Sequence, residues 1–161
     1  MEENGKIKGS YGYLEDDIDI PESVSVHFLH VDKGISICAM HYKSESSKYV
    51  FLLFSLCRRV VLYSHGNAID LGLCINNMVI LGKEFNCDFI YYDYEGYGYS
   101  NGEPHGKNLP RDLKAVYDYA HQFFAGEDIF LAGESSIVCY HVKNSWKCSN
   151  MLCGWTTLGY L

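Results

Sequence analysis

Short apolar runs alternate with helical segments along the middle of this chain, and this alternation restricts the fold more than any other feature. Val60 to Ser64, Phe89 to Tyr92 and Ile129 to Ala132 are runs of mainly apolar, β-branched or aromatic residues. Short, almost wholly apolar strands are typical of parallel sheets covered on both faces. Strands separated by helices in this order predict an α/β fold with right-handed crossovers.

Two helices are expected between these runs, flanking the sheet. The first begins after Asp70 and continues to about Phe85, because apolar residues recur there at helical spacing. The second extends from about Leu109 to Phe124, and Pro110 suits its first turn.

The N-terminal part of the chain has a different pattern. Val24 to Val31 and Ile35 to Tyr42 alternate apolar with polar residues around a turn containing Gly34, which predicts an antiparallel hairpin leading into the mostly parallel sheet. Tyr49 to Phe54 is a further apolar β run. Residues 1–23 are polar and acidic without periodicity, so we expect a surface lead-in followed by one domain over residues 24–161.

Composition excludes several classes of function. With 13 Lys and Arg against 20 Asp and Glu, the net charge is −7, and no basic cluster suits a nucleic-acid partner. The longest apolar run, Tyr49 to Cys57, is far shorter than the roughly 18–20 residues of a transmembrane helix. No leader with a basic and then an apolar region is present, and we expect a cytoplasmic protein without a transmembrane segment.

The 7 cysteines are scattered, odd in number and free of C-x-x-C pairs, which is typical of reduced thiols. A metal site built from the C-terminal cysteines and histidine is the one alternative. Its candidate ligands are Cys139, His141, Cys148 and Cys153. Their spacing fits no known ligand pattern, so no metal is expected.

Gly133-Glu134-Ser135-Ser136 directly follows the strand predicted at Ile129 to Ala132. A nucleophile elbow needs a small residue two positions before the serine, and Gly133 meets this requirement. The pattern G-x-S-x-G would place a second glycine where Ile137 stands. The alternative is that Ser135 caps a helix N-terminus.

Ser64-His65-Gly66-Asn67 follows another predicted strand. A glycine-containing loop at a strand end can direct a main-chain N–H at a developing oxyanion. The N–H of Asn67 is the first candidate donor, and that of Ser136 is the second. The alternative is an ordinary turn in which Asp70 caps the next helix and His65 packs against the loop.

A glycine-rich segment, Tyr92-Asp93-Tyr94-Glu95-Gly96-Tyr97-Gly98-Tyr99-Ser100-Asn101-Gly102, follows the strand between these two. Its glycines allow a sharp turn over the sheet edge, and its tyrosines are expected to wall a pocket. It is not a dinucleotide loop, because G-x-G-x-x-G would need glycine at Asn101. No nucleotide cofactor is therefore expected.

Together these segments resemble the α/β-hydrolase superfamily, and in particular α/β-hydrolase domain-containing protein 17, the protein depalmitoylases. The resemblance covers about Val24 to Ser136 and is carried by Ser64–Gly72, Asn86–Pro104, Lys107–Tyr119 and Ile129–Ser136. It implies a serine hydrolase of acyl esters or thioesters that needs no cofactor and acts on acylated proteins, with palmitoyl-cysteine as the expected group, or on small acyl esters.

Carried over residue by residue, Ser135 matches the catalytic nucleophile, and Asn67 with Ser136 matches the oxyanion hole. The remaining motif residues are His65, Gly66, Asp93, Gly96, Gly98 and Gly133. Peripheral membrane association stays open, because these depalmitoylases have a cysteine-rich N-terminus and this chain has no cysteine before Cys38.

The chain departs from the family after Ser135. Such enzymes place an acid and then a histidine later in the sequence, whereas the 26 residues after Ser135 contain His141 but neither Asp nor Glu. Without those partners a serine is a poor nucleophile. An impaired or inactive chain is therefore expected, and the alternative function is a non-catalytic pseudoenzyme or interaction module.

Two segments look foreign to the family: Phe51 to Val60, which resembles an insertion, and the sequence from Ile137 onward. An unspliced intron with a shifted reading frame would explain both, and a shortened paralogue is the alternative. Either origin predicts an incomplete, C-terminally truncated α/β-hydrolase fold.

Overall fold

The computed structural model describes residues 6–8, 17–45, 58–67, 69–134 and 151–153. Its centre is a sheet with the strand order β3-β4-β6-β5-β7-β8. The bounds are β3 (Val24–Asp32), β4 (Ile35–Tyr42), β5 (Val60–Ser64), β6 (Asp88–Tyr92), β7 (Ile129–Gly133) and β8 (Met151–Cys153). A separate antiparallel pair, β1 (Lys6–Lys8) and β2 (Asp17–Asp19), lies in the N-terminal lead-in.

The sheet is antiparallel at one end and parallel over the rest. β3 and β4 form the predicted hairpin, in register from Val24 opposite Tyr42 to Asp32 opposite Ile35. β4 is antiparallel to β6, whereas β5 is parallel to both β6 and β7, and β8 is parallel to β7. The prediction of a hairpin leading into a mostly parallel sheet is confirmed.

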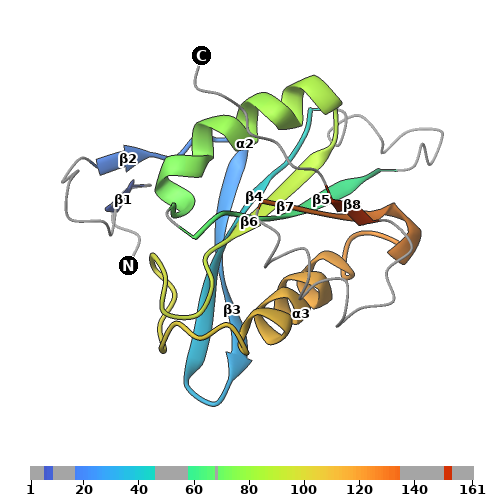
Figure 1. Ribbon diagram of the computed structural model, residues 1–161. Coiled ribbons are helices and arrows are strands. Elements are labelled where there is room, and N and C mark those ends of the chain that lie inside the picture. The colour runs from blue at the N-terminus through green and yellow to red at the C-terminus, as the bar shows by residue number, and fades with distance from the viewer. Residues whose placement is uncertain (1–5, 9–16, 46–57, 68, 135–150, 154–161) are drawn as a thin grey trace.

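The helices α2 (Leu71–Phe85) and α3 (Leu109–Ala120) cover opposite faces of this sheet (Figure 1). α2 begins where predicted, because the Asp70 side chain accepts a hydrogen bond from the main-chain N–H of Leu73 at 3.1 Å. None of the helices in the described residues is long and apolar enough to cross a bilayer.

The predicted end of the second helix at Phe124 is wrong. α3 ends at Ala120, and a turn follows in which the N–H groups of Phe123 and Phe124 both donate to the Ala120 carbonyl. The Phe124 side chain is nevertheless buried in the core, with 5% of its surface exposed. The apolar periodicity in the sequence therefore continues past the end of the helix.

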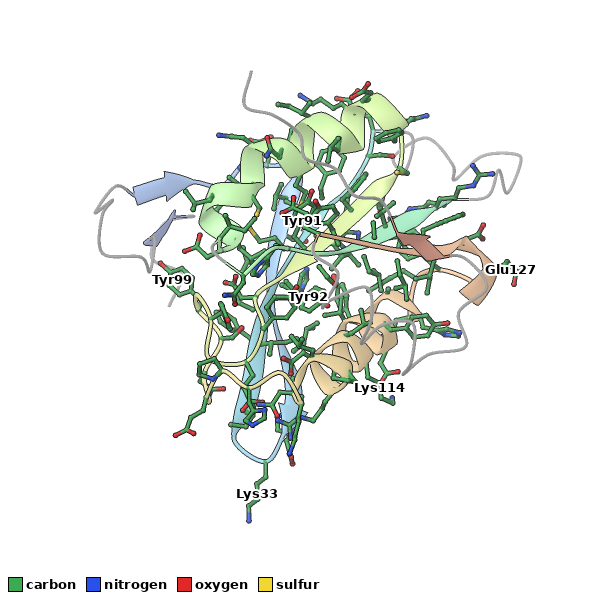
Figure 2. All side chains as sticks on the ribbon, in the orientation of Figure 1. Lys33, Tyr91, Tyr92, Tyr99, Lys114 and Glu127 are labelled. Carbon is green, nitrogen blue, oxygen red and sulfur yellow. The ribbon has the colours of Figure 1, made fainter. Side chains whose placement is uncertain are left out.

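Alternating side chains divide the core between the two faces. Figure 2 shows Tyr91 and Tyr92, adjacent on β6, on opposite sides of the sheet. Tyr91 belongs to the cluster packed against α2, and Tyr92 to the cluster packed against α3. The period of two along β6 thus buries both faces, as predicted for a covered parallel strand.

Most of the suspected insertion, and the β run expected at Tyr49 to Phe54, lie outside the described residues. The end of that segment is described and is built into the fold. Arg58 forms an ion pair with buried Asp88 at 2.7 Å, and its guanidinium lies 4.8 Å from the centroid of the Phe124 ring. Val60 is fully buried in β5.

Candidate active site

The loops after β5, β6 and β7 leave the sheet at one edge. Ser64 at the end of β5 lies opposite Gly133 at the end of β7, and Tyr63 lies opposite Tyr91 of β6. β5 is central, and the chain moves from β5 to β6 on one side before it crosses to β7 on the other. Ligands of open α/β sheets bind outside the carboxyl ends of the strands at such a switch point.

The predicted nucleophile Ser135 and the second oxyanion donor Ser136 lie outside the described residues, as does the tail with Cys139, His141 and Cys148. The chain is described up to the residue before Ser135. The N–H of Glu134 donates to the Ser64 carbonyl at 3.0 Å, which continues the pairing of β7 with β5. Glu134, the residue before Ser135, therefore lies next to the loop after β5.

The Glu134 side chain also lies against that loop. Its Oε1 accepts a hydrogen bond from the Tyr63 hydroxyl at 2.6 Å. Its Oε2 lies 3.1 Å from the position a Cβ would occupy on Gly66. Burial, followed by the hydrogen bond to Glu134, raises the pKa of Tyr63 far above its ordinary value. The Gly66 position is thus closely neighboured by the segment that leads to Ser135.

His65 is fully buried and packs against the loop, which is the structural role that the sequence left open. Its Nδ1 lies 2.8 Å from the Gly66 carbonyl oxygen, so Nδ1 carries the proton. Its Nε2 lies 3.4 Å from Asp93 Oδ1 without the geometry of a hydrogen bond. The ring also packs on Tyr94, with centroids 4.6 Å apart.

Asp93 joins the glycine-rich segment to the start of α2. Its carboxylate accepts hydrogen bonds from the main-chain N–H groups of Leu71, at 3.1 Å, and Tyr99, at 3.3 Å. A carboxylate at a helix N-terminus is stabilised by the helix dipole and by the N–H groups that the first turn leaves unpaired. Gly98 has a φ of 49°, and a Cβ there would lie 1.9 Å from Asp93 Oδ2. This is a physical reason for glycine at Gly98.

Two tyrosines of the glycine-rich segment donate hydrogen bonds to the loop after β5. The Tyr94 hydroxyl donates to the His65 carbonyl at 2.7 Å, and the Tyr97 hydroxyl donates to Asn67 Oδ1 at 2.5 Å. Tyr94 is buried and Tyr97 is partly exposed, whereas Asn67 is exposed. The two tyrosines thus join the loop that contains Gly66 and Asn67 to the segment that follows Asp93.

No family model matches the sequence. Among curated proteins, the chain is 36% identical over 119 residues to α/β-hydrolase domain-containing protein 17C of Xenopus laevis, covering 69% of this chain and 38% of that protein. It is 41% identical over 99 residues to the human protein of that name, covering 59% of this chain and 30% of the relative. The matching region thus spans well under half the length of these relatives.

Solved structures agree on the fold. Epoxide hydrolase VrEH1 from Vigna radiata superposes with a TM-score of 0.59 at 18% identity, covering 82% of this chain and 38% of that one. Est1E from Butyrivibrio proteoclasticus gives 0.52 at 20% identity, covering 68% and 42%. The chain has part of an α/β-hydrolase fold. Its sequence relatives are proteins of the α/β-hydrolase domain-containing protein 17 group.

A charged network that the sequence reasoning missed anchors the glycine-rich segment of this α/β-hydrolase fold. The N–H of Glu95 donates to Asp112 Oδ2 at 3.0 Å, and Arg111 forms ion pairs with Glu95 and, at 2.8 Å, with Asp32 of the hairpin. Asp112 is fully buried, and burial, followed by the charge of Glu95, raises its pKa to about 6. A carboxylate on the apolar face of α3, four residues before Val116, was the sequence signal.

A second network of polar side chains lies at the other end of the strands of the α/β-hydrolase sheet, where β6 begins. His41 Nε2 lies 3.1 Å from Asp88 Oδ2, and His41 Nδ1 lies 3.1 Å from the Tyr119 hydroxyl, which also lies 2.9 Å from His27 Nε2. These groups join β3, β4 and β6 to α3. No cluster of three or more metal-ligating side chains occurs within the part of the chain that the structure describes.

Proposed function

We propose that this chain carries the nucleophile and oxyanion hole of a serine hydrolase that cleaves acyl esters or thioesters. The observation that supports the proposal most is the pairing of β5 with β7 through Ser64 and Gly133, extended by the hydrogen bond from Glu134. Through this pairing, Gly133 and Glu134, which precede the candidate nucleophile, lie beside Ser64, which precedes the candidate oxyanion loop.

In the proposed reaction, Ser135 Oγ attacks the acyl carbonyl carbon while its proton passes to a general base. The carbonyl oxygen becomes an oxyanion, which accepts hydrogen bonds from the N–H groups of Asn67 and Ser136. The intermediate then collapses, the protonated alcohol or thiol leaves, and water hydrolyses the acyl-serine. No cofactor enters these steps.

His65 is not the proposed base, although it lies in the oxyanion loop. Its side chain is fully buried and its Nδ1 is hydrogen-bonded to the Gly66 carbonyl. A general base must come within hydrogen-bond reach of the hydroxyl it deprotonates. We assign His65 and Asp93 a structural role beneath the loop.

The substrate class follows from the resemblance to protein depalmitoylases. We propose acylated proteins, with palmitoyl-cysteine thioesters as the expected substrate, and small acyl esters as surrogates. A cytoplasmic protein with peripheral access to membranes would meet such substrates, and both features stay predictions.

Labelling with a fluorophosphonate tests the nucleophile. The phosphonyl group bonds to an activated serine oxygen and fluoride leaves, so intact mass and peptide mapping report the modified residue. The proposal requires one adduct on Ser135 in the folded chain, formed slowly if the nucleophile is impaired, and none in Ser135→Ala. Ser136→Ala is the matched control, because it keeps the main-chain N–H and should still be labelled.

A non-catalytic interaction module is the second candidate. It is favoured by Ile137, which stands where the pattern G-x-S-x-G would place its second glycine. If the folded chain takes up no label while its circular dichroism and urea transition are those of a folded domain, this second function replaces the first.

A further inference from the structure

The loop that carries the proposed oxyanion donor is held at two points by one neighbouring segment. Tyr94 binds its first residue through the His65 carbonyl, and Tyr97 binds the Asn67 side chain. The Tyr94 ring is buried and packs edge-on against the Tyr97 ring, with centroids 5.7 Å apart. Both contacts therefore come from a single aromatic unit of the glycine-rich segment.

The hydroxyl of Tyr97 starts from a backbone that is itself fixed. The N–H of Tyr97 donates to the Tyr94 carbonyl at 2.9 Å, and its carbonyl accepts from the N–H of Ser100 at 2.8 Å. Gly96 and Gly98, on either side, have φ values of 77° and 49°, so the turn uses conformations that side-chain-bearing residues rarely adopt. The hydroxyl is thus presented by an ordered turn.

Asn67 depends on a hydrogen bond such as that from Tyr97 more than His65 of the same loop does. Its side chain is exposed, while His65 is fully buried. An oxyanion donor acts only when its nitrogen lies about 2.7–3.1 Å from the developing charge. A displacement of about 1 Å can cost on the order of 100-fold in rate.

We propose that Tyr97 is a positioning residue: its hydroxyl binds the Asn67 side chain and thereby fixes the Asn67 main-chain N–H at the oxyanion hole. This inference rests on the proposed function for its catalytic consequence. The fixing of Asn67 by itself can be measured whether or not the chain reacts.

The first experiment measures the ¹⁵N order parameter of the Asn67 amide in the intact chain. We expect a rigid value of about 0.85 in the wild-type chain and a fall to below about 0.6 in Tyr97→Phe. Tyr119→Phe is the matched control, because it also removes a hydrogen-bonded hydroxyl, but one bound to His41 at the other sheet edge. An Asn67 value that is unchanged in Tyr97→Phe overturns the proposal.

The second experiment measures the rate of fluorophosphonate labelling at Ser135 in Tyr97→Phe, Asn67→Ala and the double variant. Asn67→Ala keeps the main-chain donor and removes the partner of Tyr97. Each single variant should slow labelling by about 10- to 100-fold, and the double variant should be no slower than either, because both break one contact. Losses that multiply in the double variant contradict the proposal.

The outcomes separate the two hypotheses. A wild-type chain that takes up no label refutes the proposed function, and the order parameter still decides whether Tyr97 fixes Asn67. A chain that is labelled equally fast with and without the Tyr97 hydroxyl keeps the proposed function and refutes the positioning role.

Discussion

Replacing Gly98 with alanine tests whether the Asp93 carboxylate lies where the two loops meet. The new Cβ would lie 1.9 Å from Asp93 Oδ2. The carboxylate has little freedom to move away, because it accepts main-chain hydrogen bonds from Leu71 and Tyr99. Gly98→Ala should therefore displace the carboxylate or distort the turn.

The expected cost has two parts. Placing an alanine at a φ of 49° costs about 1–2 kcal/mol. Weakening the hydrogen bonds that a charged carboxylate makes to main-chain N–H groups costs about 1.5–3 kcal/mol for each bond lost. With one hydrogen bond lost, we expect Gly98→Ala to lose about 2.5–5 kcal/mol, against the roughly 5–15 kcal/mol that holds a typical domain folded.

Two other glycines supply matched controls. Gly34 has a φ of 76°, but no heavy atom lies within 4 Å of the position its Cβ would occupy, so Gly34→Ala measures the backbone cost alone. Gly106 also has open space there, and no positive φ, so Gly106→Ala should change stability by less than about 0.5 kcal/mol. Urea unfolding followed by circular dichroism gives all three values. A loss in Gly98→Ala no greater than that in Gly34→Ala would refute the placement of Asp93.

Three further results are expected. Asp88→Asn removes the charge of a fully buried carboxylate that contacts Arg58 and His41, so it should lower the free energy of unfolding in urea by about 3–5 kcal/mol. Asp118→Asn, at an exposed ion pair with Lys114, should lower it by less than about 1 kcal/mol. Equal losses in the two variants would contradict the burial of the Asp88 ion pair. Burial raises the pKa of the Cys74 thiol to about 12, so iodoacetamide at neutral pH should modify Cys74 only after unfolding, as followed by peptide mass spectrometry, and rapid reaction of the folded chain would contradict its burial. The pKa of Asp112 is raised from 3.8 to about 6 in the folded state, which therefore binds this proton more tightly than the unfolded state does. The free energy of unfolding of the wild-type chain, relative to that of Asp112→Asn, should fall as the pH rises from about 4 through 6. A free-energy difference that stays constant over this range would contradict the raised pKa.

Local patterns predicted most of the fold because each pattern reports a burial geometry. The alternation in Val24 to Val31 matches a hairpin strand, and the uniform apolarity of Phe89 to Tyr92 matches a strand between two helices. The end of α3 could not be predicted from periodicity alone, since Phe124 reaches the core from a turn. An apolar residue in the sequence indicates that its side chain is buried. It does not indicate whether the backbone at that residue is a helix or a turn.

The site could be predicted only as far as motif order allowed. The sequence assigned Asn67 to the loop after Val60 to Ser64 and Asp93 to the segment after Phe89 to Tyr92, and the structure pairs these two strands in parallel. The Tyr97 hydroxyl binds the Asn67 side chain 30 residues away, and the Asp112 carboxylate binds the main-chain N–H of Glu95 17 residues away; no spacing rule encodes either contact. The position of Ser135 stays a prediction.

In the proposed function, Ser135 and Asn67 act on the same acyl carbonyl group. A crystal structure of the chain after reaction with a phosphonate ester would show this arrangement, because the bound phosphonyl oxygen mimics the oxyanion. We expect a covalent bond to Ser135 Oγ and a phosphonyl oxygen about 2.7–3.1 Å from the main-chain nitrogens of Asn67 and Ser136. An adduct whose oxygen points away from Asn67, or a folded chain that forms no adduct, would contradict it.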